Sequence, residues 1–122
     1  MKITTFDPAI FTKDAEGTIK LFEELGFEKQ HQKEGIDGDI TVVRMKDANG
    51  FHFDVVNAGR TVKDFISIRM NVDNFDEAYN KLLEHGFKHA PEEQIIGTKT
   101  SKAVMLVSPS GYTINLIQHI KP

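Results

Sequence analysis

His52 and Asp54 are the pair of residues in this chain whose types and spacing best suit chemistry. They are two residues apart in a segment where apolar and polar residues alternate, so on an extended strand both point to one side. A carboxylate can orient a histidine as a general base, and a histidine and an aspartate can supply two ligands of an iron site. A hydrogen-bonded structural histidine is the alternative. His52 and Asp54 are therefore the candidate catalytic residues.

Two arginines, Arg44 and Arg69, are predicted to lie on the same polar side of their strands. An arginine can hold a carboxylate or phosphate by paired hydrogen bonds, and Phe11 and Phe65 can supply flat apolar walls. The alternative is that the arginines neutralise nearby aspartates, since buried charges need partners. The alternation predicts a ligand-binding set of Asp7, Phe11, Arg44, His52, Asp54, Phe65, Ser67, Arg69, Asn71, Thr113 and Asn115. The small molecule that such a set suits is aromatic or anionic.

The elements that must position these residues occur twice along the chain. An amphipathic helix is predicted from Asp14 to Gly26 and again from Asn74 to Gly86, 60 residues later. Asp and Asn are good helix N-caps, and glycine can end a helix in a left-handed conformation. The segment 49–56 also reappears as 110–117, now with a shift of 61. The two halves therefore share one plan with a single inserted residue.

Strands are predicted before and after each helix from period-two alternation. In the strand Phe51–Val56, the residues Phe51, Phe53 and Val55 should face the helix, and in Phe65–Val72 the helix side begins at Ile66. The remaining predicted strands are Ile3–Thr12, Ile40–Lys46, Lys102–Val107 and Tyr112–Ile117, with less regular ones over Glu28–Gly35 and Lys88–Gly97.

The predicted fold is α+β, with two tandem βαβββ modules at residues 1–60 and 61–122. A half of about 60 residues buries too little surface to be securely stable alone, so the modules should complete one domain. Each sheet would have one face covered by its helix and a more polar face turned toward a cup. We therefore expect a curved mixed sheet around a cup-shaped cavity.

This doubled plan resembles the vicinal oxygen chelate superfamily, which contains glyoxalases, extradiol dioxygenases and bleomycin-resistance proteins. The resemblance rests on Gly-Phe after each helix, on the segment 72–75 before the second helix, and on the segment 108–112 before the last strand. It covers essentially the whole chain, with the pieces in the expected order. The resemblance also implies a homodimer, with cups formed within one chain or between two. The linker 57–63 would allow either.

In the metal-dependent members of that superfamily, four side chains, typically two His and two Glu, bind a divalent ion. The matching positions here are Asp7, Asp54, Ser67 and Asn115, which form repeat-related pairs at shifts of 60 and 61. Serine and asparagine are weak ligands, and two carboxylates alone would hold an oxygen-preferring ion feebly. We therefore expect neither a metal nor another cofactor.

Composition and charge exclude several classes of function. A formal charge of -3 gives no electrostatic reason to expect nucleic acid, and no apolar stretch approaches the ~20 residues of a membrane span. The absence of cysteine rules out thiolate catalysis and Cys-metal sites. A cytoplasmic location is the expectation.

Three hypotheses follow from the sequence. The preferred one is a metal-independent small-molecule-binding protein of the glyoxalase/bleomycin-resistance type. The second is an enzyme, namely a lyase, isomerase or dioxygenase that depends either on a metal or on His52 and Asp54. The third is an interaction module whose cup is filled by its own side chains.

Overall fold

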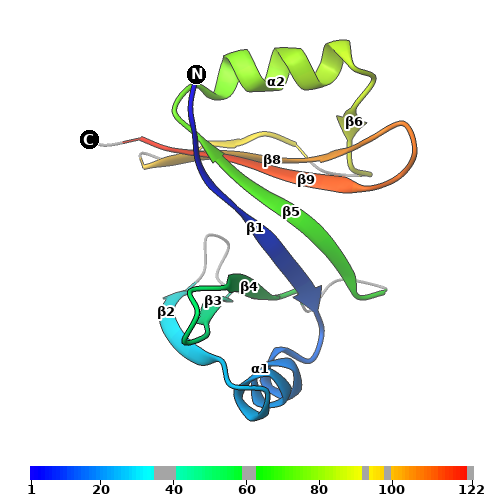
Figure 1. Cartoon of the computed structure of the whole chain (residues 1–122). Helices are drawn as coiled ribbons and strands as arrows, with labels where there is room; N and C mark the ends of the chain where they lie inside the picture. The colour runs from blue at the N-terminus through cyan, green and yellow to red at the C-terminus, as the bar shows by residue number, and fades with distance from the viewer. Residues whose placement is uncertain (35–40, 59–62, 92–93, 98–99, 121–122) are drawn as a thin grey trace. The chain divides into compact units, whose positions relative to one another are not determined.

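The computed structural model describes residues 1–34, 41–58, 63–91, 94–97 and 100–120, which contain two helices and nine strands. The chain divides into two compact units (Figure 1). We call residues Asp7–Ile66 the α1 unit, and Met1–Phe6 with Ser67–Pro122 the α2 unit, so the strands over residues 3–12 and 65–72 each belong partly to both; each is grouped with the unit that holds most of it. The first residues belong with the later part of the chain because the Lys2 amide donates to Asp73 Oδ1 at 2.6 Å and the Asp73 amide donates to the Lys2 carbonyl.

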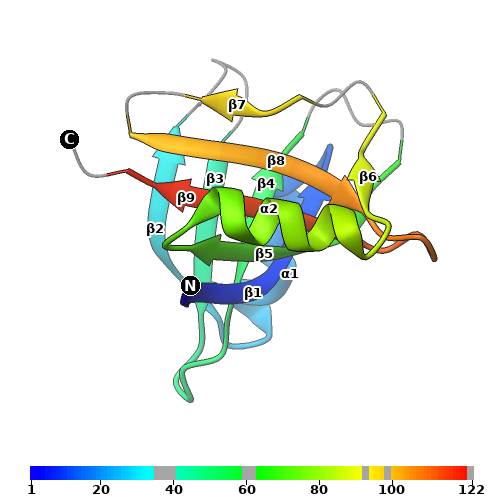
Figure 2. The ribbon, with the colours of Figure 1, turned by 90° about the horizontal axis from the view of Figure 1, so that it is seen from above.

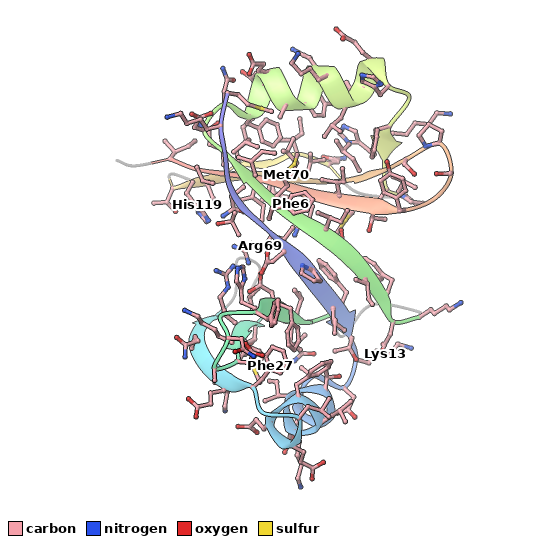
Figure 3. The ribbon with its side chains drawn as sticks, in the orientation of Figure 1. Phe6, Lys13, Phe27, Arg69, Met70 and His119 are labelled. Atoms are coloured by element: carbon pink, nitrogen blue, oxygen red, sulfur yellow. The ribbon has the colours of Figure 1, made fainter. Side chains whose placement is uncertain are left out.

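The α1 unit places one helix on one face of a mixed sheet. Its elements are β1 (Ile3–Thr12), α1 (Ala15–Glu24), β2 (Glu28–Glu34), β3 (Thr41–Lys46) and β4 (His52–Asn57). β3 is antiparallel to β2 and β4, and β1 is parallel to β4. The core joins Phe22 and Phe27 to buried strand residues such as Met45 and Phe53. Figure 3 shows Phe27 beside α1.

The α2 unit repeats this arrangement. Its elements are β5 (Phe65–Val72), α2 (Phe75–Glu84), β6 (Lys88–His89), β7 (Ile96–Gly97), β8 (Ser101–Val107) and β9 (Thr113–His119). β5 is parallel to β9, and β8 is antiparallel to β9, β6 and β7. Seen from above, α2 lies over the strands of this sheet (Figure 2). Met70 faces α2 and belongs to the core with Phe75, whereas its neighbour Arg69 lies on the other side of β5 (Figure 3).

The repeat extends to individual hydrogen bonds. Asp14 accepts from the Gly17 amide at 2.9 Å, and Asn74 accepts from the Glu77 amide at 3.1 Å, so both helices begin with the same cap. The strand pairing repeats as well, because the β1–β4 partners Ala9 and Asp54 correspond to the β5–β9 partners Arg69 and Asn115 at the shifts of 60 and 61. Equivalent positions in the two units can therefore be compared residue by residue.

The structure confirms the α+β class, the repeated module plan and the mixed pairing of strands. The predicted strand over Lys88–Gly97 is instead two short strands, β6 and β7, which both pair with β8. The module boundary between residues 60 and 61, most of the linker, and residues 35 and 40 of two predicted strands lie outside the described residues. No described helix is long and apolar enough to cross a membrane.

Two residues predicted on the helix side of their strands are exposed. Phe51 precedes the first residue of β4 and is 68% exposed, and Ile66, the second residue of β5, is 66% exposed. Strand alternation correctly gives the side of the sheet, but the helix covers only part of that side. Residues near strand ends therefore escape the core.

Candidate functional site

The side of the α1-unit sheet that faces away from α1 carries most of the polar residues predicted to act. We call it the helix-distal face. Successive strand residues alternate between sides, and Ile10, Val43 and Phe53 pack in the core under α1. Their neighbours must therefore point the other way. The helix-distal face is formed by Asp7, Ala9 and Phe11 of β1, Arg44 of β3, and His52, Asp54 and Val56 of β4.

Two buried carboxylates share one guanidinium at the centre of this face. The side chains of Asp7 and Asp54 are each 1% exposed, and that of Arg44 is 30% exposed. Arg44 donates from Nε to Asp54 Oδ1 at 3.0 Å and from Nη2 to Asp54 Oδ2 at 3.3 Å. The same Nη2 lies 3.4 Å from Asp7 Oδ2. Asp7, Arg44 and Asp54 thus form one Asp-Arg-Asp cluster. Of the two roles considered for the arginines, ligand binding and neutralisation of aspartates, these contacts give Arg44 at least the second.

His52 joins the cluster through Asp7. Its Nδ1 lies 3.2 Å from Asp7 Oδ2, and its side chain is 35% exposed. The parallel pairing of β1 and β4 brings these two residues together although they are 45 positions apart. The carboxylate in position to orient His52 is therefore that of Asp7, while Asp54 is bound by Arg44.

The pKa of Asp7 is raised in this buried cluster of two carboxyl groups. Burial, and next the negative charge of Asp54, raise the pKa of Asp7 to about 6, because Arg44 and His52 offset only part of their effect. Asp7 Oδ1 is buried and has no hydrogen-bond partner among the described residues. The hydrogen bond to Asp54 raises the pKa of Arg44, which keeps its charge.

Apolar residues flank the cluster on the same face. Phe11 stacks on Phe65, with ring centroids 4.7 Å apart and an interplanar angle of 6°. Ala9 lies between Asp7 and Phe11 on β1, Val56 is paired with Phe11 across β1 and β4, and both are buried. Both were absent from the predicted set, although strand alternation places them on this side. The face thus combines a polar centre with an aromatic end.

The equivalent positions of the α2 unit carry an uncharged version of the cluster. By the repeat, Asp7, Arg44 and Asp54 correspond to Ser67, Met105 and Asn115. Ser67 Oγ lies 3.4 Å from Met105 Sδ, and Met105 is paired with Asn115 across β8 and β9. The Ser67–Met105 contact lies where Arg44 meets Asp7, and the backbone pairing of Met105 with Asn115 repeats that of Arg44 with Asp54. The module therefore folds with a neutral set at these positions, and the charged set is not required by the fold.

The predicted ligand-binding residues divide between the two units. Six belong to the α1 unit, namely Asp7, Phe11, Arg44, His52, Asp54 and Phe65. Five belong to the α2 unit, namely Ser67, Arg69, Asn71, Thr113 and Asn115, and there Arg69 Nε donates to Asn71 Oδ1 at 3.4 Å. That both sets line one cup stays a prediction.

The four positions that correspond to metal ligands do not fit a divalent ion. Arg44 already lies between the carboxylates of Asp7 and Asp54. The Ser67 hydroxyl hydrogen-bonds to the sulfur of Met105, and the side chain of Asn115 is a neutral amide. Within the described ranges, no group of three or more His, Asp or Glu side chains is arranged to hold a metal ion. A metal ion that bound to these carboxylates would first have to displace the Arg44 guanidinium.

Comparison with known proteins gives the family context. The model of the Glyoxalase/Bleomycin resistance protein/Dioxygenase superfamily matches residues 5–116. Among solved structures, a methylmalonyl-CoA epimerase is 19% identical with a TM-score of 0.66 over 99% of each chain. The epimerase from Mycobacterium tuberculosis is 15% identical, with a TM-score of 0.68 over 98% of this chain and 90% of that one. A superfamily member from Vibrio splendidus 12B01 is 17% identical, with a TM-score of 0.64 over 98% and 100%.

These identities show a shared fold and nothing finer. No curated protein matches the chain.

Proposed function

This chain belongs to the Glyoxalase/Bleomycin resistance protein/Dioxygenase superfamily, and we propose that it is a member that binds a small molecule without a metal ion. The observation that carries this proposal is the position of Arg44. It lies within 3.4 Å of carboxylate oxygens of both Asp7 and Asp54, where it supplies the positive charge that two buried carboxylates need. The positive charge of this site is then supplied by a protein side chain and not by a metal ion.

The comparison between the repeats supports a functional role for the cluster. Buried ion pairs add little net stability, and well-packed neutral residues in their place are often as stable. The α2 unit has such a neutral set in Ser67, Met105 and Asn115. Charged residues that the fold does not require, with two side chains about one third exposed, suit recognition of a ligand.

The proposal is tested by metal analysis of protein purified without chelators or a metal-affinity column. Titration with Mn²⁺, Fe²⁺, Ni²⁺ and Zn²⁺ by calorimetry should follow. We expect less than stoichiometric metal and no dissociation constant tighter than about 1 mM, which corresponds to about −4 kcal/mol. Near-stoichiometric metal that disappears in Asp54→Ala would contradict the proposal and favour a metal-dependent lyase or dioxygenase.

A second candidate function is metal-free acid-base catalysis, which the contact between His52 Nδ1 and Asp7 Oδ2 favours. A carboxylate on Nδ1 leaves Nε2 as the base, and Arg44 could stabilise negative charge that develops on a substrate oxygen. Two of the solved structures with this fold are methylmalonyl-CoA epimerases. The test is deuterium incorporation at the α-carbon of small carbonyl compounds in D₂O, followed by proton NMR. Incorporation lost in both His52→Ala and His52→Gln would support catalysis.

We also propose that the protein is a cytoplasmic homodimer. The resemblance to the superfamily supports dimerisation, and the composition supports the location.

A further inference from the structure

The charges and hydrogen-bonding groups of the cluster limit which ligand it can accept. We infer that the ligand has no net charge at the cluster and presents a hydrogen-bond acceptor together with a donor, as a primary amide does, next to an aromatic or apolar body. This inference rests on the proposed function, because it names the chemical class that the same site would bind.

The first argument is the balance of charge. Two carboxyl groups, those of Asp7 and Asp54, face a single guanidinium, that of Arg44, so one positive charge stands against two acidic side chains. Burial of both carboxylates leaves their charge poorly screened by water. An anionic ligand group would therefore add a second uncompensated negative charge. This argues against the anionic ligand that the arginines first suggested.

The second argument concerns the donors of Arg44. Its Nε and Nη2 are engaged by the two carboxylates, and among the described residues no partner is found for Nη1. The side chain is 30% exposed, so a ligand can reach its outer edge. Guanidinium nitrogens only donate. The ligand atom that meets this edge must therefore be an acceptor, which excludes a bare ammonium or amidinium group.

The third argument concerns the outer nitrogen of His52. A carboxylate oxygen only accepts, so we assign the ring proton to Nδ1, which donates to Asp7 Oδ2 over 3.2 Å. This assignment leaves Nε2 as an acceptor on a side chain that is 35% exposed. A donor from the ligand would satisfy it. An uncharged amide supplies both the acceptor for Arg44 and the donor for His52, whereas a carboxylate has no donor and an amidinium has no acceptor.

The fourth argument concerns the body of the ligand. Phe11 is two residues beyond Ala9 on β1, and successive same-side residues of a strand are about 7 Å apart. The stack of Phe11 on Phe65 therefore lies within reach of a planar group whose polar end meets the cluster. The side chains of Ala9, between Phe11 and the cluster, and of Val56, beside Phe11, are apolar. An aromatic amide matches this order of polar and apolar residues.

The test uses three probes with nearly the same shape, which are benzoate, benzamide and benzamidinium. Their dissociation constants would be measured at pH 8 by chemical-shift changes in the NMR spectra of the full chain. We expect benzamide to bind about tenfold more tightly than either ion, since an unpaired polar group costs about 1–3 kcal/mol. The control is the variant Asp7→Ser/Arg44→Met/Asp54→Asn, which copies the neutral set of the α2 unit and should lose the preference for benzamide while remaining folded.

The outcomes separate this inference from the proposed function. Tightest binding of benzoate or benzamidinium, abolished in the triple variant, would overturn the inference and leave a metal-free binding site. A preference for benzamide that survives in the triple variant would also overturn it. Failure of all three probes to shift any signal of the helix-distal face at about 10 mM, roughly −3 kcal/mol, would count against ligand binding at this site altogether.

Discussion

In the Asp-Arg-Asp cluster, the effect of each residue on stability depends on the other two. Replacing Arg44 alone by Met leaves two buried carboxylates without a cation, and breaking a buried pair typically costs about 3–5 kcal/mol. We expect a somewhat smaller loss for Arg44→Met because Arg44 is 30% exposed. The triple variant Asp7→Ser/Arg44→Met/Asp54→Asn should instead lie within about 1 kcal/mol of the native protein. Urea unfolding at pH 8 measures both values, and a triple variant less stable than the single one would refute this coupling.

Asp7 makes the stability of the protein depend on pH. Its pKa is raised to about 6 from 3.8, so the folded state binds this proton more tightly than the unfolded state does. The stabilisation from this group is fully present below about pH 4 and is lost as the pH rises through about 6, by up to about 3 kcal/mol. Asp7→Asn should remove that dependence and raise the free energy of unfolding at pH 8.

The control for this prediction is an aspartate with the opposite shift. Asp64 accepts from Thr12 Oγ1 at 2.7 Å and from the Lys13 amide at 3.2 Å, which lowers its pKa. Its contribution is therefore lost as the pH falls, and Asp64→Asn should weaken the protein at neutral pH. Unfolding curves from pH 2 to 8 should therefore show opposite slopes relative to the native chain, below about pH 5 for Asp64→Asn and between about pH 4 and 7 for Asp7→Asn. Equal slopes would contradict the assignment of the raised pKa to Asp7.

At the scale of elements, the glycines that end the two helices offer a matched comparison. Gly26 has φ 106° and Gly86 has φ 91°, a region that costs other residues about 1–2 kcal/mol. A Cβ at Gly26 would meet nothing within 4 Å, whereas one at Gly86 would lie 2.9 Å from Pro109 Cγ. Gly86→Ala should therefore destabilise more than Gly26→Ala in thermal unfolding. Equal losses would mean that the contact with Pro109 relaxes without cost.

The elements also show what sequence patterns can and cannot predict here. Both helices were predicted from their caps and terminal glycines, since these signals are local. The sides of the strands followed from alternation, which correctly placed Arg44 and Asp54 together. The contact of His52 with Asp7 could not be predicted, because it depends on the parallel pairing of β1 with β4 across 45 positions. Alternation alone also cannot show that Phe51 lies beyond the cover of α1.

At the scale of the whole molecule, the two units differ in charge at equivalent positions although their strand pairing is the same. One unit holds the Asp-Arg-Asp cluster and the other holds Ser67, Met105 and Asn115. Duplication supplies the scaffold twice, and the chain uses its charged side chains in only one copy of these positions. This asymmetry supports the α1 unit as the proposed site of ligand binding.

Two exposed apolar side chains support the proposed homodimer. Phe6 and Ile66 are repeat-related and are 61% and 66% exposed, as expected if large apolar side chains are covered by a partner. Sedimentation equilibrium at micromolar concentration should give twice the 13.8 kDa of one chain. A mass of one chain at every concentration tested would contradict the proposal.

The most direct test of a metal-free site is the effect of Mn²⁺ on the carboxyl carbons of Asp7 and Asp54. Paramagnetic Mn²⁺ broadens the NMR signal of any carboxylate that binds it, and aspartate labelled with carbon-13 at Cγ makes each signal observable. If Arg44 is the cation of the cluster, equimolar Mn²⁺ should broaden Asp7 and Asp54 no more than the exposed Asp76. Selective broadening of Asp7 and Asp54 would show that a metal ion displaces Arg44 and would contradict this account.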